Sequence, residues 1–376
     1  MGWVEYLFVC QRESERTTPL MKSMTGTTKF TRRIRMILIG MALLSALKIA
    51  AAAGCEGDHP VFPQAASLPV LRQRAAAGDA AAQEKLALAY WNGIGVKQDT
   101  SQALVWLRKS AAGGNVEGQY LVGKYDLLHA KPGSDMTEAA HWLRLAAGRH
   151  CVPAQFYFGV LTLNDVGAPK DVKAGQQMIV SAAKAGYPEA QVWLGSMLIT
   201  GQDMPKDPKA GFAWIERAGK SGDSVGELAL ASAYLGGHGP AADRKKARHI
   251  LESVYAKHEK NYSPAAAYSL GWMYMEGKGV PVNKPMALSW MLIAANARVG
   301  DAVSRVKTLV GELPKKPLAR TCPVYMDPAF ATDGSRAYTQ MPGGERFIVL
   351  ETYKTDSLVY FPDHPLAGFV TQSCVH

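Results

Sequence analysis

A pattern of residue sizes that returns every 36 positions constrains this chain more than any other feature. Each copy has a small residue, then a large apolar residue four positions later, then directly another small residue. A period of 20 to 50 residues is typical of stacked supersecondary units, so the chain is predicted to be a repeat protein. The leading small residues are Ala82, Gly118, Ala154, Ala190 and Gly226, and the apolar residues are Leu86, Val122, Phe158, Leu194 and Leu230.

Each repeat is expected to contain two helices. In the first copy, residues 80–92 lead into the turn Gly93–Val96, and a second helix follows Asp99. Glycine at helix ends and Asp at helix starts are common boundary residues. A sixth copy fits after an insertion of four residues. We therefore predict a mainly α fold, an α-solenoid of about six 36-residue helix-turn-helix repeats, whose concave surface is available for binding. The second-helix column reads Trp106, Trp142, Met178, Trp214, Ile250 and Trp290.

The motifs at the turns resemble a known family. Leu270–Val280, which reads LGWMYMEGKGV and precedes Ala287 and Trp290, resembles the Sel1-like repeat, and Tyr90–Val96 resembles it equally well. Two copies depart from this pattern, because Asp126–His129 lacks the glycine turn and Gly236–Pro240 has no clean Asp after it. The resemblance implies a tetratricopeptide-like α-solenoid adaptor that assembles other proteins. Exported bacterial members are similar to factors in envelope assembly and signalling.

The chain divides by composition into a leader and signal peptide (1–53), a linker (54–67), the repeats (68–314), a second linker (315–321) and a tail (322–376). In the leader, four basic residues between 29 and 35 precede the apolar run Met36–Leu47, and Ala50–Ala53 follows. This order is typical of a secretory signal peptide, and the run is too short for a permanent membrane span. The protein is therefore expected to be exported, either periplasmic or secreted.

The cysteine that follows the signal leaves two alternatives open. Ala53-Gly54-Cys55 resembles a bacterial lipobox, although Ala52 stands where that motif has Leu. Cys55 is then either lipidated, which would be the protein's one membrane anchor, or a plain cysteine near the new N-terminus. Cys151 is expected to be a small buried residue, and a Cys55–Cys151 bond stays open for an unlipidated Cys55.

The tail changes from helical spacing to short β runs and is expected to form a small all-β module. The segment Gly368–Val370 resembles the closing strand of bacterial SH3-like domains, but the opening Asn-Val-Arg signature of that family is missing. Cys322 and Cys374 bracket the module. In a small exported domain such a pair is more often a disulfide than two free thiols.

Catalytic and cofactor motifs are not expected. Ser181–Lys184 and Ser304–Lys307 both spell a serine–lysine motif, but both fall at helix ends that the repeat explains. No His pair has ligand spacing with a carboxylate, and no phosphate-binding glycine loop follows a strand. About half of the net charge of +10 lies in residues 1–53, and the remaining charge is spread thinly. We therefore predict a protein that is not an enzyme and binds no metal, cofactor or nucleic acid.

Positions that point away from the buried column offer a candidate binding stripe, in which the side chains of Tyr157 and Trp193 are expected to be largely exposed. They vary in residue type between copies, and several are aromatic, a type enriched at interface hot spots. The alternative is that these side chains pack on the second helices of adjacent repeats. The candidate partner-binding residues are Lys85, Lys124, Tyr157, Trp193 and Trp272.

Taken together, these features predict an exported, non-catalytic scaffold that binds a protein partner on its concave face, in envelope assembly or signalling. The partner itself is not identified by the sequence. The alternative places the function in the tail, as a cell-wall or glycan-binding module in contact with peptidoglycan.

Overall fold

A computed structural model describes most of the chain after the leader, in two compact units that divide between Pro240 and Ala241. The signal peptide, Cys55 and Cys374 lie outside the described residues, so the predictions about them remain predictions. The described residues are 68–130, 134–236, 243–257, 262–317, 322–324, 339–341, 346–352, 356–362 and 366–371.

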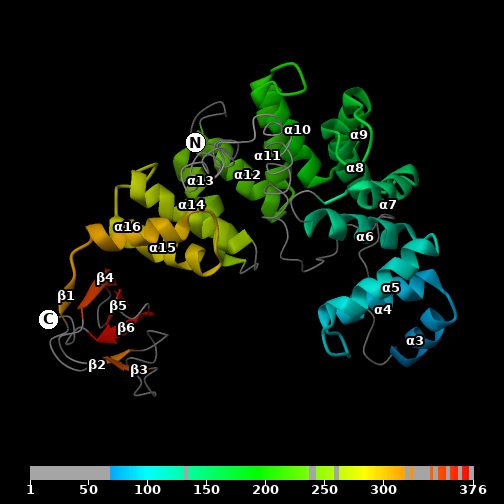
Figure 1. Ribbon diagram of the computed structural model, residues 1–376. Helices are drawn as coiled ribbons and strands as arrows, with labels where there is room; N and C mark the ends of the chain where they lie inside the picture. The colour runs from blue at the N-terminus through cyan, green and yellow to red at the C-terminus, as the bar shows by residue number, and fades with distance from the viewer. Residues whose placement is uncertain are drawn as a thin grey trace, which may run out of the picture. The chain divides into compact units, whose positions relative to one another are not determined.

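Unit 1 consists of helices arranged in successive pairs (Figure 1). After an initial helix, α3, the even-numbered helices are the first helices of the repeats, and the odd-numbered ones are the second helices. Each helix packs on the next one in the chain. The bounds are α3 (Leu68–Ala76), α4 (Ala80–Asn92), α5 (Thr100–Ala112), α6 (Val116–Leu128), α7 (Thr137–Gly148), α8 (Val152–Asn164), α9 (Val172–Lys184), α10 (Pro188–Thr200), α11 (Pro208–Lys220) and α12 (Ser224–Gly236).

Unit 2 continues with the same kind of helix and ends in strands. Its helices are α13 (Arg244–Ala256), α14 (Tyr262–Glu276), α15 (Lys284–Asn296) and α16 (Ala302–Glu312). The strands form an antiparallel sheet in the order β1-β4-β5-β6 and a separate β2-β3 ladder. Their bounds are β1 (Lys316–Pro317), β2 (Cys322–Val324), β3 (Thr339–Met341), β4 (Arg346–Thr352), β5 (Asp356–Phe361) and β6 (Leu366–Thr371).

The predicted fold class is confirmed, a mainly α repeat protein with a small β module. Strand β1 lies inside the segment expected to be a linker and pairs with β4, so the sheet begins earlier in the chain than residue 322. The aromatic rings of Phe347 and Phe361 pack together in the core of this sheet. The resemblance to SH3-like domains stays a prediction.

Helix boundaries follow the capping chemistry that the sequence predicts. Before five helices an Asp side chain accepts a hydrogen bond from the backbone N–H three residues later, at 2.9–3.0 Å, as Asp79 does from Ala82. Such a cap satisfies a donor that the helix leaves unpaired. At the other end, α4 stops at Gly93, which adopts φ 70°. The second repeat has no such cap, since α6 ends at His129 with φ −103°, as the missing glycine predicted.

Small residues hold the two helices of a repeat at close range. A Cβ at Gly195 in α10 would lie only 2.7 Å from the carbonyl oxygen of Gly211 in α11, and 2.6 Å from Cγ1 of Ile215. The converse holds too, because a Cβ at Gly211 would lie 2.6 Å from the Gly195 oxygen. Gly159 and Gly175 form the same contact between α8 and α9. The small-residue columns are therefore the sites where first and second helices approach each other.

A column of buried glutamines, which is not among the columns described from the sequence, links consecutive repeats. In three first helices a buried Gln donates its Nε2 hydrogen to the carbonyl eight residues earlier, at the end of the preceding helix. Each of these carbonyls also accepts the backbone N–H of the glycine three residues later, so the glutamine provides a second hydrogen bond that ties the helix end to the next repeat. Because the column keeps the 36-residue period, the repeat pattern could have revealed it. The pairs are Gln83 with Ala75, Gln119 with Ala111 and Gln191 with Ala183.

Cys151 precedes α8, is fully buried and is disulfide-bonded. Its partner is not among the side chains that the structure describes. Cys151 is buried, as expected, but it is half of a disulfide and not a free thiol. Cys322 lies in β2, where the backbone alone is described, so its predicted bond to Cys374 remains a prediction.

The first prediction concerns the glycine contact. Gly195→Ala should destabilise unit 1 by about 1–3 kcal/mol, because the added methyl group meets backbone that cannot move aside. Gly148→Ala is the matched control: it is also a helical glycine of unit 1, and no atom lies within 4 Å of its Cβ position. Thermal unfolding should show a loss for the first variant and none for the second. Equal melting temperatures for both variants and the parent would contradict the contact.

The second prediction concerns Cys151. Under denaturing conditions without reductant its sulfur should resist alkylation, and it should react fully after reduction. Mass spectrometry of proteolytic peptides would then identify the partner cysteine. A Cys151 peptide that is alkylated without reductant in protein from an oxidising compartment would overturn the disulfide.

Candidate functional site

Helices meet across repeats in two ways. Each second helix of unit 1 packs on the first helix of the next repeat, and the first helices α6 and α8, and α10 and α12, also contact each other. We define the inner face as a set of interacting side chains on and beside these first helices. Its residues are Glu84 on α4; Glu117, Tyr120 and Lys124 on α6; Tyr157 on α8; and Tyr187, Glu189 and Trp193 at α10.

The structure places the five predicted binding residues in different environments. Lys85 is exposed, Lys124 and Trp193 are half-buried, and Trp272 is half-buried in unit 2 with Lys278 Nζ 3.8 Å from its ring centroid. Tyr157 is 0% exposed, so the expectation that its ring is largely exposed is wrong. Partner binding by these residues stays a prediction.

The burial of Tyr157 has a clear cause. Tyr120 on the neighbouring first helix lies 6.2 Å away between ring centroids, and Phe156 packs edge-on at 5.0 Å. Phe156 in turn contacts Trp193 on α10 at 6.0 Å. These rings form an aromatic band across three first helices. The alternative interpretation, packing rather than exposure, therefore holds for Tyr157, and its ring contacts are with residues of first helices.

Lys124 lies at the centre of the inner face. Its Nζ donates a hydrogen bond to the Tyr120 hydroxyl at 2.9 Å and lies 5.4 and 5.3 Å from the ring centroids of Tyr120 and Tyr157. An ammonium over aromatic faces is a favourable arrangement. Burial alone would lower the pKa of Lys124, but the Tyr157 hydroxyl and the nearby carboxylates outweigh burial and raise that pKa. The side chain therefore carries its positive charge at neutral pH.

Carboxylates surround this single central cation. Burial and the neighbouring Glu117 raise the pKa of Glu84 from 4.5 to about 7, while Lys85 opposes the shift. Burial also raises the pKa of Glu189, which interacts with Lys124 and is repelled by Asp223. Like charges that share a poorly solvated site disfavour each other's ionised form. The inner face thus carries more acidic groups than basic ones.

Two buried tyrosine hydroxyls extend this polar network. The hydroxyls of Tyr157 and Tyr187 interact with each other, and that of Tyr187 also interacts with Glu189. Burial raises the pKa of both hydroxyls, so each stays protonated. The sequence contained no signal for this pair.

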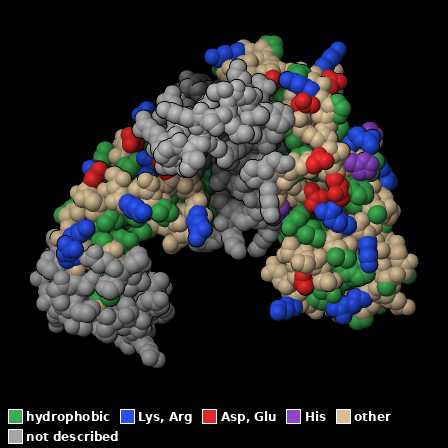
Figure 2. Space-filling model, in the orientation of Figure 1, with side chains coloured by type: hydrophobic (Ala, Val, Ile, Leu, Met, Phe, Trp, Pro, Cys, Tyr) green, Lys and Arg blue, Asp and Glu red, His purple; other side chains and the backbone are tan. Residues whose placement is uncertain are grey.

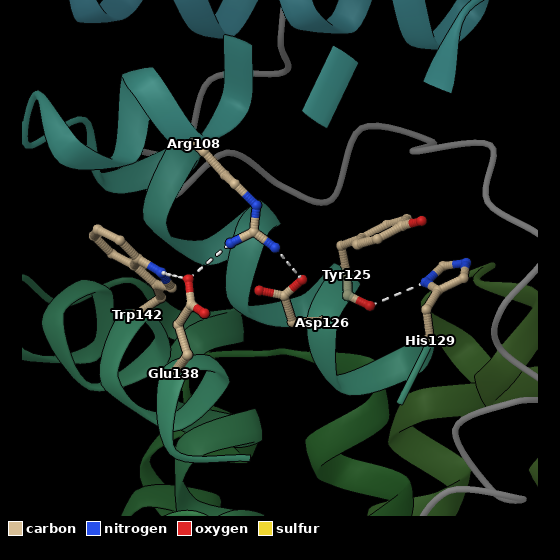
Figure 3. Close-up of polar contacts among 6 residues, drawn as sticks. All are labelled: Arg108, Tyr125, Asp126, His129, Glu138 and Trp142. Atoms are coloured by element: carbon tan, nitrogen blue, oxygen red, sulfur yellow. Dashed lines mark hydrogen bonds and ion pairs between the residues drawn. The ribbon is translucent and has the colours of Figure 1, made fainter. Parts of the chain in front are cut away.

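A second polar cluster joins α5, α6 and α7 (Figure 3). Arg108 contacts the carboxylates of Asp126 and Glu138, both at 2.8 Å, and the Trp142 indole donates to Glu138 at 3.3 Å. Beside it, the rings of Tyr125 and His129 stack at 3.9 Å. The pKa of Asp126 is raised by burial in spite of Arg108.

This cluster is best explained as structural. The exposed ends of Arg108 and Glu138 limit its energetic value, since exposed ion pairs typically contribute under about 1 kcal/mol. Asp126 and His129 belong to the segment that lacks the glycine turn, so the cluster holds together the repeat that departs most from the pattern. Arg108 and Glu138 lie 30 residues apart, and the sequence did not indicate their contact.

Neither a group of metal ligands nor a membrane-spanning helix is found within the described ranges. There, no three His, Cys, Asp or Glu side chains are grouped to hold a metal ion, and no helix is both long and apolar enough to cross a membrane. On the face drawn in Figure 2, Lys and Arg side chains are spread over the described surface.

A model of the Sel1 repeat family matches five stretches of this chain, residues 80–115, 116–149, 188–223, 224–253 and 264–298. The stretch between 149 and 188 is not among them, yet it contains the helix pair α8 and α9 with the same glycine contact. The family model therefore supports the repeat boundaries that the 36-residue period predicts.

Solved structures with the same kind of fold also match. A Sel1 repeat protein from Oxalobacter formigenes is 25% identical, with 81% of this chain and 86% of that chain covered and a TM-score of 0.49. A protective antigen of uropathogenic Escherichia coli strains is 21% identical, with 81% and 59% covered and a TM-score of 0.45. An immunity protein from Pseudomonas aeruginosa is 19% identical, with 64% and 84% covered and a TM-score of 0.35. A search of curated proteins found no significant match.

The third prediction concerns Glu84, which is 7% exposed. In the folded state the pKa of Glu84 is raised from 4.5 to about 7. The stability that the protonated Glu84 carboxyl contributes is therefore fully present below pH 4.5 and is lost as the pH rises through 7. Glu84→Gln should therefore stabilise unit 1 by roughly 2–3 kcal/mol at pH 8.5 and have little effect near pH 4.

Thermal melts at both pH values check this. The matched control is Glu216→Gln on α11, where the carboxylate is paired with Lys220 at the surface, and it should shift stability little at either pH. If Glu84→Gln changes stability by the same amount at pH 4 and pH 8.5, the pKa of Glu84 is not raised in the folded protein.

Proposed function

Because this chain belongs to the Sel1-like repeat family, we propose that it is an exported, non-catalytic scaffold that binds a protein partner on the inner face of unit 1. Sel1 repeats are typical of scaffolds for protein–protein interactions. In repeat arrays of this kind, the surface formed by corresponding helices is the usual binding surface.

The observation that carries the proposal is the composition of the inner face. Aromatic and charged side chains from α6, α8 and α10 meet there, although the packing of each repeat already relies on its small and apolar columns. Aromatic residues flanked by polar groups are typical of binding hot spots. The half-buried Trp193 is the ring of this band best placed to contact a partner directly.

Export is supported by two independent observations. The residues between 29 and 53 have the order of a secretory signal, and Cys151 is disulfide-bonded, which is common in oxidising compartments and rare in the cytosol. The two also bear on lipidation, because a cysteine sulfur bonded to Cys151 cannot carry a lipid thioether. If peptide mapping identifies Cys55 as the partner, the lipid anchor is excluded. The proposal also includes a role in envelope assembly or signalling, for which export is a precondition.

Site-specific photocrosslinking in the native cell envelope tests the proposed surface. A crosslinking residue at Trp193 should capture one discrete protein, whereas the same group at Gln177, which is exposed on the second helix α9, should not. Labelling from both positions would indicate non-specific contact. Capture of glycan strands by the tail, without any protein captured at Trp193, would contradict the proposal and favour the cell-wall alternative.

A further inference from the structure

The disulfide of Cys151 attaches another part of the chain to the start of α8. Cys151 is fully buried and stands immediately before the first turn of that helix. The chain contains five cysteines, so the partner is one of four. The identity of the partner decides which segment is fixed at this end of α8. The four candidates are Cys10, Cys55, Cys322 and Cys374.

The two cysteines of the β module are placed to bond each other. Cys322 lies in β2, and β2 contacts β6, which ends at Thr371. Cys374 follows that end by three residues, so it lies within about 11 Å of it. Cys10 precedes the apolar run of the leader and is removed with the leader when the chain is exported. Cys55 is the cysteine that is left for Cys151.

Cys55 is within reach of Cys151. It lies 13 residues before Leu68, the start of α3, and a segment of this length spans at most about 45 Å. From α3 to α8 the helices α4 and α6 lie between, and Trp91 of α4 packs edge-on against Tyr125 of α6. Three interaxial steps of about 10 Å and the length of α3, about 13 Å, stay below that limit. The path crosses the first helices of the first two repeats.

The start of α8 differs from the starts of the other first helices of unit 1. An acidic residue stands either directly before the helix or in its first turn at α4, α6, α10 and α12, but not at α8. Cys151 also makes no side-chain cap there. An anion at a helix N-terminus is favourable because the first N–H groups lack partners and the helix dipole is positive at that end. The position before the helix recurs every 36 residues, as Asp79, Asn115, Cys151, Tyr187 and Asp223.

The segment that begins at Cys55 carries the charges that α8 lacks. It reads Cys55-Glu56-Gly57-Asp58, so two carboxylates follow within three residues of the sulfur. A bond from Cys55 to Cys151 would bring both of them to the N-terminal end of α8. The charge of the segment and the missing anion at α8 are therefore complementary.

We propose that Cys55 is the partner of Cys151, that residues 56–67 span α4 and α6, and that the carboxylates of Glu56 and Asp58 lie at the start of α8. The bond forms when each thiol loses a proton and two electrons pass to a protein disulfide of the oxidising compartment, which is reduced to a dithiol. The Cys55 sulfur then has no position for a lipid, and the N-terminal segment becomes a fixed part of unit 1. This inference goes beyond the proposed function and takes from it only export.

Peptide mapping tests the pairing on the full chain, exported with its own leader and digested with trypsin without reductant. Each possible bond gives a different mass, because the four cysteines that follow the leader fall in different peptides, which end at Arg72, Lys170, Arg336 and His376. The peptides of Cys55 and Cys151 should be linked and should separate on reduction. A lipid on Cys55, or a bond from Cys151 to Cys322 or Cys374, would overturn the inference and leave export in place. A bond to Cys10 would contradict export as well.

Substitution of single cysteines gives a second test. Cys55→Ser should make Cys151 reactive to alkylation in the unfolded chain without reductant. It should also lower the melting temperature of unit 1 by roughly 5–10 °C, because a loop of about 100 residues is no longer closed. Cys322→Ser is the matched control, and Cys151 should stay protected in it. Protection of Cys151 in Cys55→Ser, or its loss in Cys322→Ser, would assign the bond to another cysteine.

The position of the carboxylates is tested by Glu56→Gln combined with Asp58→Asn. In the oxidised protein this double variant should lower the melting temperature by roughly 1–4 °C, since α8 loses the anion at its start. In the Cys55→Ser background it should have no effect, because the segment is no longer attached there. Equal shifts in both backgrounds, or no shift in either, would show that the two carboxylates do not act at α8. Photocrosslinking from Trp193 depends on none of these variants, so the proposed function is tested separately.

Discussion

The close approach of backbone to backbone between the two helices of a repeat is the constraint on which the rest of unit 1 depends. At Gly195 and Gly211 each glycine lies where a Cβ would meet the carbonyl of the other. With the helices held so closely, the large apolar residue beside each small one fills the remaining space. The side chains on the opposite side of the first helix are left to form the inner face, and their positions repeat because the contact repeats.

Much of this could be predicted from the sequence because burial repeats with a fixed period. The glycine contacts, the Asp caps and the missing cap at His129 all depend on residues within one helix or between sequence neighbours. The exposure of Tyr157 could not be predicted in the same way. Helical periodicity gives the direction of a side chain from its own axis, but it does not show that Tyr120 of the preceding first helix covers that direction.

Contacts between residues that do not share the 36-residue period could not be predicted from the sequence, for a related reason. Arg108 meets Glu138 across 30 positions, and the sequence shows each of them only as an ordinary surface charge. For Cys151 the sequence left a free buried thiol and a bond to Cys55 as alternatives, and the structure decides for a disulfide without identifying the partner. The glutamine column is different, since Gln83, Gln119 and Gln191 keep the period and were available to the same reasoning.

The polar side chains of the inner face interact differently from those in the rest of the array. Asp side chains cap helices and buried glutamines bond carbonyls between repeats, whereas on the inner face an ammonium bonds a tyrosine hydroxyl and neighbouring carboxylates repel each other. In a repeat array stability comes mainly from nearest-neighbour packing, so the glycine contacts behind the first helices can sustain a face that is itself unfavourable. Natural proteins tend to retain local instability where binding requires it. A face that combines aromatic rings with charged groups has the composition typical of binding hot spots, and this composition distinguishes the inner face from the packing columns behind it.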